Sequence, residues 1–233
     1  MNQPKVRVHN LGLVDYKNAW DLQEELLKKA VEVKIQNRKQ KTTILPEQHL
    51  IFCEHPHVYT LGKSGVQNNL LLNDAKLKEL EAEFYKINRG GDITYHGPGQ
   101  LVMYPILDLE QFFTDIHKYM RLLEEAVIQT LAHFGIHSKR YDGLTGVWLD
   151  AENANARKIC AMGVKCSRWV TMHGIALNIA PDLKYFEHII PCGIQDKAVT
   201  SMAKEMGTAP NFEEVRLMLS KKMASVFQFQ LMQ

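Results

Sequence analysis

The sequence predicts an α+β fold built around a mixed sheet, and three observations favour it. The chain has 233 residues, of which 45% are hydrophobic, and this is enough to bury one core. Short apolar runs typical of strands alternate unevenly with helical patterns, and several follow one another directly, which argues against a regular βαβ winding. The chain shows no internal repeat and no low-complexity linker. We therefore expect residues 1–233 to form a single domain.

The first half of the chain is expected to combine one long helix with short strands. After an apolar stretch over residues 6–14, Asp15 is placed to cap a helix whose apolar side chains recur every three or four positions. A polar loop over residues 39–47 follows, and Pro56 separates the next two apolar runs. The expected elements are a helix over residues 17–38, strands over 49–53 and 58–61, and a helix from Asn73 with Leu77, Leu80 and Phe84 on one face.

The second half is expected to be richer in strands and to close on helices. Tyr104 and Pro105 lie within an apolar run, which indicates a bend or a sheet edge at that point. Gly135 is placed to end the long amphipathic helix before it. The expected elements are a strand over residues 101–107, a helix over 114–134, strands over 147–149, 159–165 and 170–179, and helices over 197–206 and 212–227.

Composition limits the classes of function. With 28 basic and 26 acidic residues, the net charge of +2 argues against general attraction to nucleic acid or to an anionic membrane. The chain has no run of about 18 apolar residues and no signal-peptide pattern, so a cytoplasmic location is expected. The four cysteines, at positions 53, 160, 166 and 192, form no Cys-x-x-Cys pair, so free thiols are expected rather than a disulfide framework or a zinc site.

The most informative stretch is the glycine-rich loop over residues 89–100, which precedes an apolar strand. Glycine permits positive φ and close approach of another group to the backbone, whereas Pro98 fixes its own φ. The loop is therefore expected to be ordered and to bring its backbone close to a ligand.

Two side chains far apart in the sequence are candidates for acyl transfer through a thioester. Cys192 precedes a glycine, which leaves space for an acyl group and can present an N–H to an oxyanion. Lys158 lies in an expected strand, and beside a thiol its ammonium would favour the thiolate while its neutral form could take the proton. Taken alone, the Cys192 pattern is more often that of an ordinary buried thiol, and the Lys158 pattern is at least as often that of a solvated edge-strand lysine.

Other polar motifs carry less information. His96 and His173 could hydrogen-bond a substrate carbonyl or orient the lysine, although an isolated histidine is more often structural. His133 and His137 have the i,i+4 spacing of metal ligands, but the helix is expected to end between them. Residues 61–64 imitate the end of a P-loop without the glycine required five positions earlier, so triphosphate binding is not expected there.

Several separated motifs together resemble one family. They cover residues 54–62, 89–100, 145–148, 157–164, 173–178 and 191–193. In this order they resemble the lipoyl(octanoyl) transferases, relatives of the biotin and lipoate protein ligases, over most of the chain. The resemblance implies a biotin/lipoate ligase-like fold, with a mixed, largely antiparallel sheet flanked by helices.

The resemblance also implies an activity. It is the transfer of an octanoyl group from octanoyl-acyl carrier protein to a specific lysine of a lipoyl domain, in lipoate biosynthesis, with Cys192 as the acyl-carrying nucleophile and Lys158 activating it. Expected acceptors are the lipoyl domains of 2-oxo acid dehydrogenase complexes and the glycine cleavage H protein. No metal or cofactor is expected, because the donor is already an activated thioester. The substrate-binding residues implied are Arg89, Gly90, Gly91, Asp92, Ile93, Thr94, Tyr95, His96, Ala161, Met162, Gly163, His173, Gly174, Ile175 and Ala176.

Two alternatives stay open. A lipoate or biotin ligase of the same fold would adenylate a free acid with ATP and use its lysine on the acyl-adenylate, and the Pro-Cys-Gly motif weighs against it. A non-catalytic module that binds lipoyl domains would need neither Cys192 nor Lys158. Cys160 and Cys166 stand where the family pattern favours small or aliphatic residues, so a competing thiol is conceivable.

Overall fold

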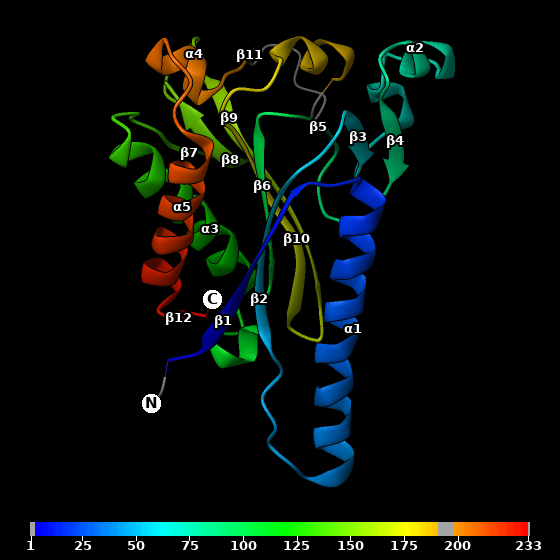
Figure 1. The fold of residues 1–233 in the computed structure, drawn as a ribbon, viewed down its shortest axis with the longest axis vertical. Coiled ribbons are helices and arrows are strands. Elements are labelled where there is room, and N and C mark those ends of the chain that lie inside the picture. Colours follow the sequence, from blue (N-terminus) through cyan, green and yellow to red (C-terminus); the bar gives the residue numbers. More distant parts are fainter. Residues whose placement is uncertain (1–2, 191–197, 233) are drawn as a thin grey trace.

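The computed structural model describes residues 3–190 and 198–232, and its largest element is a mixed sheet (Figure 1). Its strands are β1 (Lys5–Leu13), β2 (Gln48–Glu54), β6 (Gln100–Ile106), β7 (Lys139–Tyr141), β8 (Leu144–Leu149), β9 (Arg157–Ser167), β10 (Val170–Asn178), β11 (Ala198–Val199) and β12 (Gln230–Met232). Within the described ranges their order is β12-β1-β2-β6-β10-β9-β8-β7, and β11 pairs with β9 beside this path. Pairing is antiparallel from β2 to β7, whereas β1 lies parallel to β2 and β12. The expected mixed, largely antiparallel sheet is confirmed.

Helices cover both faces of this sheet. Figure 1 shows α1 (Tyr16–Gln40) along one side, and α3 (Ile116–His133) with α5 (Phe212–Phe227) on the other. Side chains alternate across β2, so Leu50 and Phe52 join the core beneath α3 and α5, while Ile51 and Cys53 join the core beneath α1. The shorter helices are α2 (Asp74–Glu79), α4 (Met202–Met206), η1 (Gln67–Asn69), η2 (Leu109–Gln111) and η3 (Leu183–His188). In the part of the chain that the structure describes, no helix has the length and hydropathy that a membrane crossing requires.

A second, smaller sheet carries the glycine-rich loop. It consists of β3 (Val58–Leu61), with β4 (Glu83–Lys86) parallel on one side and β5 (Ile93–His96) antiparallel on the other. Its own apolar cluster includes Tyr59, Leu61 and Ile93. The loop over residues 89–92 therefore lies directly before an edge strand that the small sheet holds in place.

Most elements appear where the sequence predicts them, but two helices differ in extent. The helix from Asn73 does begin with that side chain accepting a backbone N–H at 2.9 Å, yet it ends at Glu79. Phe84 lies in β4 instead, because the Glu83 N–H donates to His57 O at 2.9 Å and starts the parallel pairing with β3. The helical spacing of this phenylalanine was misleading, since tertiary pairing overrides local propensity.

The start of the expected helix over residues 197–206 is also wrong. Residues 198–199 form β11, and α4 begins at Met202 after Ser201, whose hydroxyl accepts the Lys204 N–H at 3.2 Å. At α1, Asp15 occupies the N-cap position, but its side chain makes no capping hydrogen bond.

Pro105 lies in the interior of the sheet, because β6 has neighbours on both sides, so the expectation of an edge is wrong. The pairing of β6 with β10 ends at Met103 and Ile175. A Cβ added to Gly174 would lie 2.7 Å from Pro105 Cδ, so the proline ring faces β10 where that ladder has stopped. Its missing N–H therefore costs no strand hydrogen bond, and its carbonyl accepts from Thr171 Oγ1 at 2.8 Å.

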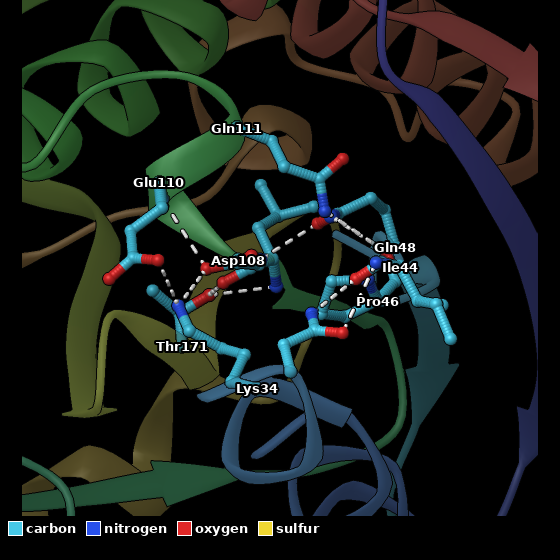
Figure 2. A network of polar contacts seen from close by, with 10 residues as sticks. Lys34, Ile44, Pro46, Gln48, Asp108, Glu110, Gln111 and Thr171 are labelled. Carbon is cyan, nitrogen blue, oxygen red and sulfur yellow. Dashed lines mark hydrogen bonds and ion pairs between the residues drawn. The ribbon is translucent and has the colours of Figure 1, made fainter. Parts of the chain in front are cut away.

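A polar network ties the loop after α1 to the sheet (Figure 2). Lys34 reaches the carboxylates of Asp108 and of Glu110, the latter at 3.1 Å. The Asp108 N–H donates to Gln48 Oε1 at 2.8 Å, and Gln48 Nε2 donates to the carbonyl of Pro46 at 3.2 Å. Asp108 is only 3% exposed, so its charge depends on Lys34 for compensation.

Candidate active site

A cavity of about 540 Å³ lies between the small sheet and the main sheet. Strands β9 and β10 form one wall, because their antiparallel register sets Gly163 opposite Gly174 and Ala161 opposite Ala176. The expected binding residues that line the cavity are Arg89, Gly90, Gly91, Asp92, Ile93, Thr94, His96, Ala161, Met162, Gly163, His173, Gly174, Ile175 and Ala176, and Lys158 lines it as well. Three motifs far apart in the sequence therefore meet around one cavity.

Tyr95 is the expected binding residue that the structure does not bring to the cavity. Side chains alternate across a strand, so Thr94 and His96 face the cavity while Tyr95 faces the core of the small sheet. Its hydroxyl hydrogen-bonds with His57 Nδ1 at 2.8 Å, and its ring stacks on that of Tyr185 at 5.0 Å. Tyr95 therefore supports the loop from behind.

Close backbone contacts explain the glycines of this site. The Gly90 N–H donates to Val164 O at 2.9 Å, which joins the loop to β9. A Cβ added to Gly163 would lie 2.7 Å from Gly90 O, and one added to Gly62 would lie 2.3 Å from Gly91 O. Side chains at these positions would push the loop away from both sheets.

The residues that imitate a P-loop have another task. The backbone N–H groups of residues 62–64 donate to carbonyl oxygens of residues 89–92 at 3.0–3.2 Å. Arg89 strengthens the same junction, because its Nη2 donates to the carbonyl of Thr60 at 2.8 Å. These amides are occupied within the protein and are not directed at a phosphate.

His96 and His173, two of the histidines that line the cavity, favour the neutral form at physiological pH. Burial is the main cause that lowers the pKa of His96 to about 3, and likewise that of His173 to about 3. His96 Nδ1 hydrogen-bonds with Gln100 Oε1 at 2.7 Å, and His173 Nε2 hydrogen-bonds with Asn88 Oδ1 at 3.0 Å. His173 also has a positive φ of 59°, a strained conformation for this residue. Burial therefore disfavours the cationic form of both imidazoles at neutral pH.

Lys158 extends along β9 into the cavity beside an aromatic ring. Its Nζ lies 4.6 Å from the centroid of the Trp148 ring. Gly146, with φ of +114°, lies close to the backbone of β9, since an added Cβ would lie 2.6 Å from Cys160 O, and it borders the Lys158 stem. The Gly146 N–H donates to the buried Glu124 at 3.0 Å, so this carboxylate fixes the turn next to the lysine.

The cysteines that the structure describes are poor nucleophiles. Cys53 and Cys160 are buried, and burial raises the pKa of each thiol well above its usual value. Burial also raises the pKa of the Cys166 thiol. The raised pKa of the Cys160 thiol disfavours a competing role for this residue. Cys192, the expected nucleophile, lies outside the described residues.

Several cavity residues were missed by the sequence-based selection. Tyr16, Gln100, Tyr104 and Asn178 also line the cavity. Gln100 and Asn178 end two of the recognised motifs, which was a usable signal, whereas nothing local marks Tyr16 in its helix. Within the described residues, no group of three or more His, Cys, Asp or Glu side chains is arranged to hold a metal ion.

The fold is shared with solved lipoate protein ligases. A lipoate protein ligase of Thermoplasma acidophilum matches with a TM-score of 0.70 at 14% identity, covering 100% of this chain and 87% of that one. Residues 15–224 match the model of the lipoyl protein ligase A/B catalytic domain, and the chain belongs to this family. The octanoyltransferase of Christiangramia forsetii is 60% identical over 228 residues, which are 97% of each chain. That of Cytophaga hutchinsonii is 57% identical over 226 residues, 96% of this chain and 93% of the relative.

Proposed function

We propose that this protein is an octanoyltransferase that acylates a lysine of lipoyl domains in lipoate biosynthesis. The observation that carries the proposal is the shared cavity, where Lys158 and the three binding segments converge. Similarity over nearly the whole chain to proteins named octanoyltransferase supports the same activity. We take residues 1–233 as one catalytic domain.

The cavity offers an apolar wall to an acyl chain. Ala161, Met162, Ile175 and Ala176 line it from adjacent strands. Burying about seven methyl and methylene groups at about 0.8 kcal/mol each supplies roughly 5–6 kcal/mol before ordering costs. The polar end of the substrate then lies towards the glycine-rich loop and Lys158.

The reaction we propose proceeds through an acyl-cysteine. Lys158 takes the proton of the Cys192 thiol, the thiolate attacks the carbonyl of octanoyl-acyl carrier protein, and the carrier thiolate leaves and takes the proton. The acceptor amine then attacks the acyl-cysteine, a C–N bond forms, and the C–S bond breaks. The amine proton passes through Lys158 to the Cys192 thiolate, so no ATP is consumed.

The described residues on either side of the segment 191–197 support a role for Cys192 at this cavity. Ile189 and Ala198 flank residues 191–197, and both line the cavity. Ile189 is three residues before Cys192, and three peptide units span at most about 11 Å. This short connection supports the proposal that the Cys192 thiol and the Lys158 amine meet at this cavity.

Lipoyl domains are the proposed acceptors, from 2-oxo acid dehydrogenase complexes and from the glycine cleavage H protein. The solved Thermoplasma acidophilum ligase is described together with an E2 lipoyl domain, which is consistent with a partner of this kind.

The test is octanoylation of a purified lipoyl domain, followed by its mass. Octanoyl-acyl carrier protein without ATP should add one octanoyl group to the domain, and a lipoyl domain without its acceptor lysine should stay unmodified. Modification that requires free octanoate and ATP would instead identify a ligase. If the lipoyl domain binds but is not modified under either condition, the protein would be a non-catalytic module that binds lipoyl domains.

A further inference from the structure

A buried amide connects His96 to the core of the main sheet. Gln100 is 1% exposed, and its Nε2 donates to Tyr95 O at 3.2 Å and to Asn178 Oδ1 at 2.9 Å. Its Oε1 lies 2.7 Å from His96 Nδ1. Asn178 in turn uses its Nδ2 to donate to the carbonyl of Thr200 at 3.0 Å.

The carbonyls at the ends of this network fix the direction of every hydrogen bond in it. A backbone carbonyl only accepts, so the group of Gln100 that faces Tyr95 O must be the NH₂, and the group of Asn178 that faces Thr200 O must be its NH₂. Gln100 then presents its oxygen to His96. Because that oxygen only accepts, His96 Nδ1 carries the hydrogen.

This arrangement leaves Nε2 of the neutral imidazole without a hydrogen. Within the described ranges, Nε2 makes no hydrogen bond. It is also not one of the fully buried polar atoms that lack a partner there, so it is accessible from the cavity. His96 lines the cavity. A bare nitrogen lone pair therefore faces the space where substrate would lie.

Burial is the main cause that lowers the pKa of His96 and favours its neutral form, while the hydrogen bond to Gln100 acts in the opposite direction. Tyr16 stacks on it with ring centroids 6.0 Å apart, and His55 meets it edge-on at 5.9 Å. The charged or titratable neighbours that act on it are His55, Arg89 and His173, and each of them opposes a positive charge on the imidazole.

We propose, on the basis of the octanoyl-transfer function, that His96 Nε2 accepts a hydrogen bond from the attacking lysine amine, and that Gln100 is the positioning residue that sets this tautomer. The amine N–H points to Nε2, so its lone pair is directed at the acyl carbonyl. The nitrogen becomes a stronger donor as the C–N bond forms, and the hydrogen bond strengthens with it. In this tautomer His96 Nε2 cannot donate to the acyl carbonyl, which is one of the two roles that the sequence left open.

The same network reaches the proposed base. The Thr200 N–H donates to Lys158 O at 2.9 Å, next to the carbonyl that Asn178 holds. Gln100 and Asn178 therefore connect the strand of His96 with the strand of Lys158, and the two side chains face one cavity in a fixed relation.

The direct test is the ¹⁵N spectrum of the His96 ring in the wild-type protein, which needs no activity. The signals can be assigned from the backbone or by their loss in His96→Gln. We expect a pyrrole-type Nδ1 and a pyridine-type Nε2 at neutral pH. A pyridine-type Nδ1, or two protonated nitrogens, would overturn the proposal. In Gln100→Glu the carboxylate should drive the ring towards the doubly protonated form.

A kinetic test separates this inference from the proposed function. Loading of the enzyme from octanoyl-acyl carrier protein and transfer from the loaded enzyme to a lipoyl domain are measured as two rates. His96→Leu should slow the transfer about tenfold more than the loading, as expected for one lost hydrogen bond, and His96→Gln should recover part of it because its amide oxygen can accept. His49→Gln, at a buried histidine outside the cavity, should change neither rate.

Equal effects of His96→Leu on both rates would contradict the proposal. A wild-type enzyme that is never loaded would instead refute the octanoyl-transfer function, and the tautomer result would stand by itself.

Discussion

Buried neutral histidines should make the fold sensitive to mild acid. Burial is the first cause that lowers the pKa of His49 and of His55 to about 4, and that of His96 and of His173 to about 3. All four are at most 7% exposed. In the unfolded chain a histidine titrates near pH 6.5. Between these values the unfolded state binds protons that the folded state does not.

The direction and size of the effect follow from this difference. The stability that the four neutral histidines contribute is fully present above about pH 6.5. It is lost as the pH falls towards their pKa values in the folded state. At about pH 5 each histidine costs about 2 kcal/mol, so four cost on the order of 6–8 kcal/mol, against total stabilities of about 5–15 kcal/mol. The protein should be close to its unfolding midpoint near pH 5.

Urea unfolding followed by tryptophan fluorescence measures this directly. The free energy of unfolding should be flat from about pH 8 to pH 7 and fall steeply between about pH 6.5 and pH 5, above the range where ordinary carboxylates titrate. His49→Gln removes one of the four groups and should reduce the slope of this fall by about one proton. Equal stability at about pH 7 and pH 5 would refute the reasoning.

Three further substitutions, two of them with a matched control, test individual residues. Gly146→Ala should lower the free energy of unfolding in urea by about 2–4 kcal/mol and slow octanoyl transfer, because the new Cβ would lie 2.6 Å from a backbone oxygen. As a control, Gly143→Ala places a Cβ that meets nothing within 4 Å and should cost about 1 kcal/mol. Lys158→Ala should slow acylation of the enzyme about 100-fold or more, with partial recovery at higher pH, where more thiolate forms. An unchanged acylation rate at neutral pH would remove Lys158 from the mechanism. Lys34→Met should lower the free energy of unfolding by about 3 kcal/mol, because it leaves the buried Asp108 carboxylate without its partner. Lys28→Met breaks an exposed i,i+4 pair and should cost at most about 0.5 kcal/mol. Equal effects of the two substitutions would contradict this account.

The long, periodic elements could be predicted from the sequence. The helix over residues 212–227 matches α5 to the residue, because its apolar spacing is regular and Asn211 caps it through the Glu214 N–H. The strand over residues 58–61 also matches, since turn-forming residues border it. Phe84 was misassigned because helical spacing cannot reveal that a neighbouring strand will recruit it.

The site could be predicted in part. The glycine-rich loop and the β9 and β10 segments were identified, since their glycines mark places where backbones approach closely. Strand alternation shows why Tyr95 turns away, but the strand bounds were needed to apply it. Tyr16 could not have been found, because its neighbours in the cavity are far away in the sequence.

The central claim is that Cys192 carries the octanoyl group, and the mass of the intact protein tests it most directly. After mixing with octanoyl-acyl carrier protein, the wild type and Cys166→Ser should each gain one hydroxylamine-labile octanoyl group. Cys192→Ser and Cys192→Ala should gain no such group. A labile adduct that persists without this cysteine, or a wild type that stays unmodified while octanoylation of the lipoyl domain proceeds, would contradict the account.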